Sequence, residues 1–410
     1  MTRPSPRAWA TAAGVLLVAA AWAWGAHALW TSTELPTTDL PQLDPHAYFS
    51  DHFLERSATY ERFLAIVSLL GSAVVIAALA VYARNGHRLA RESAAGRVGT
   101  GLLLAMLGSA IVWLTQVPFD LASLWWQRRY DVSHQGYVTH LLNSFLSLGS
   151  EFVFVCLGFA VMMGLAGAIR RWWWLVATPA FAALGLAFVF VSPYLIPDTS
   201  PIDDPQLVAE ARALERIENA PEARLRVQEV KEFTTAPNAM ASGLGPSRTV
   251  VLWDTLLDDD FSPEEVRLVL AHEVAHLAHD DPLKRVGWMA VFLIPALGLL
   301  ALLTRRRGGL ARPEAVPIAL LVLVIAQLVA APLLNSAYRR EEAAADWAAL
   351  EATREPETDR SLMQQLARKS LSNPDPAGWV DGLFGTHPTI MQRIAISQAW
   401  EDGARLGEVP

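Results

Sequence analysis

The stretch from Ser262 to Asp281, SPEEVRLVLAHEVAHLAHDD, decides how this chain is interpreted. Serine, proline and glutamate at its first, second and fourth positions form an N-cap, a first helical residue and a capping-box partner, so a helix is predicted to begin here. His272 and His276 lie four residues apart and therefore project from one face of that helix, where both imidazoles can reach one metal ion. Glu273 lies beside that face.

This H-E-x-x-H pattern predicts one zinc ion per chain. Glu273 is predicted to be the general base, because zinc lowers the pKa of a bound water to about 7 and a nearby carboxylate can take its proton. The alternative is that two surface histidines have this spacing by accident. Leu268, Leu270 and Val274 would bury the other side of the helix, which favours a built site over an accidental one.

A catalytic zinc usually has three protein ligands and an open position, so a third ligand is needed. His279 is close, but three residues past His276 it would point off the shared face near the end of the helix. Glu342 and Asp346 are four apart on a predicted helix over residues 339–351, among alanines that allow close packing. We predict that Glu342 completes the ligand set His272, His276 and Glu342, and that Asp346 orients a ligating histidine.

The competing interpretation of residues 339–351 is an ordinary charged surface helix. Glu341 is expected to be a solvated neighbour of Glu342. If Glu342 is the ligand, this helix must pack against the helix that carries His272, although a membrane hairpin separates them in the sequence.

The composition indicates a membrane protein, since 52% of the residues are hydrophobic, 18% are charged and the mean hydropathy is +0.27. Uncharged apolar runs are each close to the length of about 20 residues that crosses a bilayer as a helix. There are seven such runs, at residues 9–29, 63–82, 98–117, 141–169, 172–196, 286–303 and 315–335.

The predicted fold class is a mainly α integral membrane protein with seven transmembrane helices and a split α+β metallopeptidase domain of the gluzincin type. Residues 1–196 form a five-helix membrane region, and residues 197–285 the first part of the peptidase domain. Residues 286–335 supply two more membrane helices, and residues 336–410 the second part of the domain.

A short sheet is expected in the first polar stretch. Residues 204–219 have helical apolar spacing. Residues 225–231, 239–243 and 248–253 have strand character, with a glycine-rich turn at residues 243–246.

Other features limit the function. The single cysteine, Cys156, excludes an intrachain disulfide and a cysteine metal site, and no basic run of the nucleic-acid type is present.

Arg3 and Arg7 precede an apolar stretch that ends in an A-x-A pattern, so cleavage of residues 1–28 as a signal peptide stays open. The oligomeric state cannot be read from the sequence.

The chain resembles the M48 metallopeptidases, and within them the Ste24-type CAAX prenyl proteases rather than the shorter HtpX type. The family pattern R-x-x-E-x-x-A-D matches Arg339, Glu342, Ala345 and Asp346, and a late T-H-P-x-x-x-x-R-I element matches residues 386–394. Residues 117–121 and 128–133 resemble the Ste24-type segment between the third and fourth helices.

The resemblance implies roles for further residues. His387 would steady the oxyanion of the tetrahedral intermediate, with electrostatic support from Arg339 or Arg393. Residues 237–240, which include the predicted substrate-binding residues Asn238, Ala239 and Met240, would form an edge strand that pairs with the peptide backbone. Glu151, in the fourth apolar run, would face a large internal chamber.

The leading hypothesis is a membrane zinc metalloendopeptidase acting on peptide or protein substrates. The alternative is a transporter, receptor or chaperone-like membrane protein with a structural zinc domain, but such a closed site would lack the base Glu273. The basic residues are almost all arginines, which suggests a high-GC bacterial genome. The membrane is then expected to be a bacterial plasma membrane. Short-loop charges place the metallopeptidase domain outside the cytoplasm, whereas the Ste24-type family has its zinc on the cytosolic side.

Overall fold

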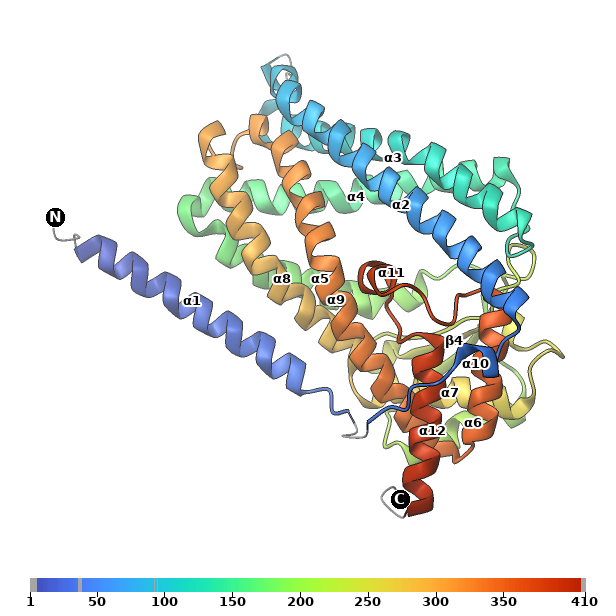
Figure 1. Ribbon diagram of the computed structural model, residues 1–410. Helices are drawn as coiled ribbons and strands as arrows, with labels where there is room; N and C mark the ends of the chain where they lie inside the picture. The colour runs from blue at the N-terminus through green and yellow to red at the C-terminus, as the bar shows by residue number, and fades with distance from the viewer. Residues whose placement is uncertain (1–5, 36–38, 92, 94, 407–410) are drawn as a thin grey trace.

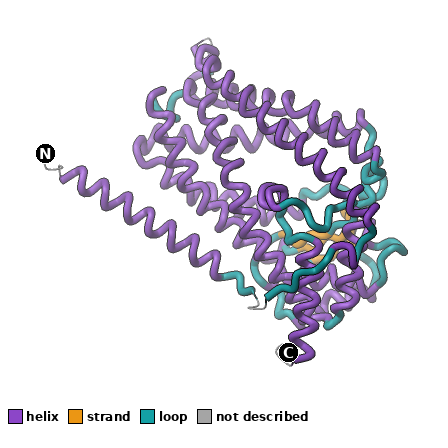
Figure 2. Tube along the Cα trace, viewed as in Figure 1, coloured by secondary structure: helices purple, strands orange, loops and turns teal. Residues whose placement is uncertain are grey.

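The structure, a computed structural model, describes residues 6–35, 39–91, 93 and 95–406 (Figure 1). Arg3, which belongs to the signal-peptide interpretation, lies outside these residues. Long helices dominate the chain, with a small mixed sheet and several helices gathered at one end (Figure 2). The long helices are α1 (Pro6–Thr31), α2 (Asp51–Asn85), α3 (Gly96–Arg129), α4 (Tyr137–Ile169), α5 (Trp173–Val191), α8 (Asp281–Thr304) and α9 (Val316–Thr353).

Six candidate membrane spans follow from helix length and composition in the described part of the chain. One of them, Tyr137–Tyr194, contains both α4 and α5, which a 3-10 turn at Arg170–Trp172 separates and which pack against each other. The predicted helical membrane fold is therefore confirmed, while the count of seven spans stays a prediction.

The sheet has four short strands in the order β1-β2-β4-β3. Their bounds are β1 (Thr199–Pro201), β2 (Arg224–Gln228), β3 (Ala239–Ser242) and β4 (Thr249–Trp253). β2 and β4 are parallel, and β3 pairs antiparallel with β4, with Met240 opposite Val251. β3 is therefore an edge strand, and the glycine-rich turn after it joins it to β4, as the sequence predicted.

The remaining helices surround the sheet. They are α6 (Pro205–Ile217), α7 (Pro263–Ala278), α10 (Pro356–Ser370), α11 (Gly378–Phe384) and α12 (Ile390–Leu406). One hydrophobic cluster contains Leu214, Leu252 and Leu270 from the first polar stretch together with Leu362 and Ile394 from the second. Side chains from before and after the α8–α9 hairpin thus share one core. The exact domain boundaries stay a prediction.

The membrane region is fastened to the sheet just ahead of β3. The backbone N–H of Thr235 donates to Val132 O, and the N–H of His134 donates to Phe233 O, so the loop after α3 runs beside the segment that leads into the edge strand. This contact fixes β3 relative to the long helices.

Candidate active site

Helix α7 places both histidines of the motif. Its start is the predicted capping box, in which Ser262 Oγ accepts from the Glu265 N–H at 3.2 Å and Glu265 Oε2 accepts from the Ser262 N–H at 2.9 Å. Leu268, Leu270 and Val274 are buried on its inner side. The helix is therefore held at its beginning and along its length, and its motif face has a defined direction.

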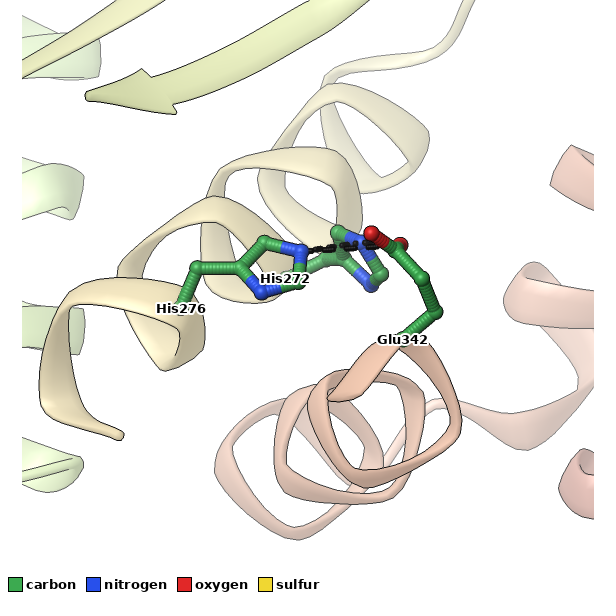
Figure 3. A group of neighbouring side chains, drawn as sticks. All are labelled: His272, His276 and Glu342. Atoms are coloured by element: carbon green, nitrogen blue, oxygen red, sulfur yellow. Dashed lines mark hydrogen bonds and ion pairs between the residues drawn. The ribbon is translucent and has the colours of Figure 1, made fainter. Parts of the chain in front are cut away.

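The side chains of His272, His276 and Glu342 meet between α7 and α9 (Figure 3). His272 Nε2 lies 3.1 Å from His276 Nε2 and 3.2 Å from Glu342 Oε2, and the distance from His276 Nε2 to Glu342 Oε2 is 3.5 Å. Ligands at about 2.0 to 2.1 Å around a tetrahedral ion are about 3.3 Å apart, so these spacings fit a metal at the centre of the three atoms. The structure thus brings together the three predicted ligands.

Each histidine has a carboxylate behind it. His272 Nδ1 lies 2.9 Å from Asp346 Oδ1, and His276 Nδ1 lies 2.8 Å from Asp281 Oδ2. A proton on each Nδ1 leaves an unprotonated Nε2, and two such lone pairs facing each other at 3.1 Å repel unless a cation lies between them. The donor set therefore fits a metal ion. Asp346 was predicted for this role, whereas Asp281 was missed.

The two oxygens of Glu342 have separate partners. Oε2 faces the histidines, while Oε1 accepts from Arg285 Nη2 at 3.1 Å. Arg285 also donates through Nε to Glu341 Oε2 at 3.2 Å. The expectation that Glu341 is solvated was wrong, because its side chain is only 1% exposed and is paired with this guanidinium.

Arg393 holds Asp346 in place. Its guanidinium donates through Nε to Oδ2 at 2.8 Å and through Nη2 to Oδ1 at 2.5 Å, the two-point geometry that fixes a carboxylate best. Burial lowers the pKa of Arg393, but the charge of Asp346 outweighs it and raises the pKa above its ordinary value. Arg393 thus acts on the site through Asp346.

His387 and Arg339 belong to the same corner. His387 Nε2 lies 3.3 Å from Glu342 Oε2. Arg339 does not point at the metal-ligand cluster; its Nη1 donates to the carbonyl oxygens of Asp381 and Gly385 at 3.1 and 2.6 Å. Arg339 therefore fixes the loop that carries His387.

A cavity of about 600 Å³ opens beside these groups. Glu273 lines it, and among the described residues its carboxylate has no hydrogen-bond partner, so it is available to a ligand. Asn238, Ala239 and Met240 line the same cavity from β3. All residues predicted to bind substrate thus lie in the cavity that contains the histidines.

The sequence profile of peptidase family M48 matches residues 201–401. The chain belongs to this family. An uncharacterized metalloprotease, YhfN, of Bacillus subtilis is 26% identical over 310 residues, which are 72% of this chain and 72% of that protein. A protease HtpX homolog of Polaromonas naphthalenivorans is 29% identical over 290 residues, covering 64% of this chain and 92% of the relative.

The crystal structure of S. mikatae Ste24p superposes with a TM-score of 0.74 at 16% identity, covering 92% of this chain and 96% of that one. That likeness concerns the fold. Together with the match to the family profile, the shared fold confirms the prediction of a multi-pass membrane metalloendopeptidase. The alternative of a membrane protein with a purely structural zinc domain is not favoured.

Protons compete for the metal-ligand cluster of this M48 peptidase. Burial lowers the pKa of His272, but Asp346 and Glu342 outweigh it and raise the pKa to about 9. Burial acts likewise on His276, where Glu342 and Asp281 raise the pKa to about 10. In the metal-free protein the two imidazoles therefore bind protons more tightly than free histidines do.

We expect the affinity for metal to fall as the pH is lowered below about 10, because protons then bind His276 and, below about 9, also His272, and the ion must displace them. Competition with a chromophoric chelator at a series of pH values measures this affinity. An affinity that stays constant from about pH 9 to about pH 6 contradicts the expectation.

Proposed function

We propose that the chain hydrolyses peptide bonds with one zinc ion held by His272, His276 and Glu342. The observation that carries the proposal is the triangle of donor atoms, 3.1 to 3.5 Å apart, with the other nitrogen of each histidine against a carboxylate. Nitrogen and carboxylate donors in a three-ligand set suit a catalytic zinc. When bound, the ion would polarise the scissile carbonyl and lower the pKa of a water molecule.

The side chains around the triangle supply the rest of the chemistry. Glu273 accepts the proton of the attacking water and passes it to the leaving amine. His387, at the rim of the triangle, donates to the oxygen on which negative charge develops. Arg393 keeps Asp346 fixed behind His272, and Arg339 keeps the loop of His387 in position.

Strand β3 supports a substrate held in extended form. Asn238 O accepts from Trp253 N–H at 2.9 Å, so by the alternation of an antiparallel ladder Met240 also directs its backbone toward β4. The backbone groups of Ala239 and Ala241 then point away from the sheet. Because β3 lines the cavity, we propose that the peptide pairs with these two residues while Asn238 and Met240 contact its side chains.

Replacement of Ala241 by proline tests this pairing. Proline removes one outward N–H without breaking a bond to β4, and edge strands tolerate it. We expect Ala241→Pro to raise KM about tenfold for a peptide substrate while zinc content is kept. Ala241→Gly is the matched control, since it keeps the N–H. A KM equal to that of the wild type would remove β3 as the substrate strand.

The proposal as a whole is tested by cleavage of casein by the purified protein in detergent. Cleavage should stop with a chelator and return with stoichiometric zinc. If metal-free protein cleaves casein, or if zinc binds and no cleavage occurs, the proposed function is wrong.

We also propose that the N-terminus lies in the cytoplasm of a bacterial cell and that the zinc site faces outside the plasma membrane. The excess of arginine in the short loops on the N-terminal side supports this orientation. In the variant Glu357→Cys, the new thiol on α10 should react in intact cells with a maleimide that cannot cross the membrane. Labelling only after lysis would reverse the orientation.

A further inference from the structure

A second hollow, of about 730 Å³, lies far from the metal-ligand cluster. It is formed by the start of α3, the turn between α4 and α5, and the turn between α8 and α9, at the opposite end of the long helices from α7 (Figure 1). The charged residues that line it are all arginines, namely Arg97, Arg170, Arg171, Arg305 and Arg312. Nothing in the peptidase chemistry uses them.

The arginines come together through the backbone of these turns. Gly308 and Gly309 have φ values of +85° and +78°, which fold the α8–α9 turn tightly. A Cβ on Gly308 would lie 2.5 Å from Arg312 Cδ, and one on Gly167 would lie 3.1 Å from Arg97 Nη2. Two arginine side chains thus lie directly against glycines, where any larger residue would displace them.

The charged side chains that the structure describes around this hollow are all positive. Among the described residues that line it, none is aspartate or glutamate. Arg97, Arg170, Arg305 and Arg312 are exposed, so their guanidinium groups are within reach of a ligand. Several cations around one depression attract an anion, and guanidinium forks suit the oxygens of a phosphate group.

A preference for arginine in short loops on one side of a membrane explains the number of arginines but not their arrangement. Arg306 shows the difference, since it is exposed on the same turn as Arg305 yet does not line the hollow. The arginines that do line it come from three separate parts of the sequence.

The rest of the lining is apolar. Trp173, Ala301 and Leu310 are buried in this lining. Trp173 begins α5 and Ala301 lies near the end of α8, both within candidate membrane spans, and Leu310 lies in the turn that follows α8. A ligand that fits this hollow has a phosphate group, which contacts the arginines, and an apolar part, which contacts the apolar lining. We propose that this hollow binds the phosphate of an anionic phospholipid, held by Arg97, Arg170, Arg305 and Arg312 at the end of the membrane region.

The test uses the delipidated full-length protein in detergent, titrated with phosphatidylglycerol while bound lipid is counted by native mass spectrometry. The double variant Arg170→Gln/Arg312→Gln removes two lining charges. The matched control, Arg84→Gln/Arg306→Gln, removes two exposed arginines that do not line the hollow. We expect the first variant to bind the lipid about thirty-fold more weakly than the wild type, and the control to bind it normally.

Three outcomes overturn the proposal. Equal weakening by both variants would mean that only total charge matters. Equal binding of phosphatidylcholine would mean that the anionic headgroup is not recognised. Inorganic phosphate that binds as tightly as the lipid and displaces it would make the free anion, and not a phospholipid, the ligand. Because the zinc site is not involved, the zinc content of both variants should equal that of the wild type.

Discussion

Glu273→Gln should leave a folded, metal-loaded protein that cleaves peptides about a hundred- to ten-thousand-fold more slowly than the wild type. The amide has nearly the size of the carboxylate but cannot accept a proton from water at neutral pH. Glu273 lines the cavity without taking part in the contacts of His272, His276 or Glu342, so the substitution leaves those contacts in place. Turnover of casein and zinc content per chain, measured on one preparation, separate the two effects.

The control for this variant is Glu264→Gln, on the first turn of the same helix. Glu264 is exposed and lies far along α7 from the histidines, so its loss should change turnover little. If Glu273→Gln retains near-normal cleavage, Glu273 is not the base. If it loses zinc as well, its role is structural.

The part of the site that the sequence predicted depends on regular helix geometry. The four-residue spacing of His272 and His276, and again of Glu342 and Asp346, fixes which side chains share a face before any tertiary contact is known. A capping box likewise specifies where α7 begins. These relations are local, so the sequence was sufficient for them.

Asp281 and Arg285 were missed because their roles depend on how the chain turns between α7 and α8. The left-handed conformation of Asp280, with φ of 54°, redirects the backbone so that the first residue of α8 faces back toward His276. Arg285, one turn further on, then reaches Glu341 and Glu342 across to α9. A carboxylate five residues after the motif was the available signal, but spacing across a helix break does not define a direction.

The burial of Glu341 has the same origin. On an isolated helix it would point to solvent, and the guanidinium of Arg285 from the neighbouring helix helps to offset the cost of removing its charge from water. Similarly, the predicted short helix at residues 339–351 is the end of α9, which continues without a break from the preceding apolar run. Glu342 is therefore attached rigidly to a candidate membrane span, a coupling that the sequence did not reveal.

Glu342→Ala should abolish stable zinc binding. Loss of an outer partner such as Asp281 typically costs about 10- to 100-fold in metal affinity, and loss of a ligand should cost more. Glu342→Gln tests the same point with less change in volume, since it keeps a side chain beside Arg285. His279→Ala is the control, because His279 ends α7 and is not one of the three clustered donors. Zinc loss in the control but not in the Glu342 variants would move the third ligand to His279.

Removal of the metal should also loosen two distant segments together. If Glu342 on α9 and the histidines on α7 share one ion, zinc bridges helices that the whole α8–α9 hairpin separates in the sequence. Chelation should therefore raise hydrogen exchange in residues 262–280 and in residues 339–351 alike, while α2 and α3 keep their protection. Without the ion, only protons can link the facing nitrogens of His272 and His276 to the carboxylate of Glu342. The contact between α7 and α9 is then weaker, and both helices are held less firmly. If only residues 262–280 respond, the ion is held without Glu342, and the site is built on α7 alone.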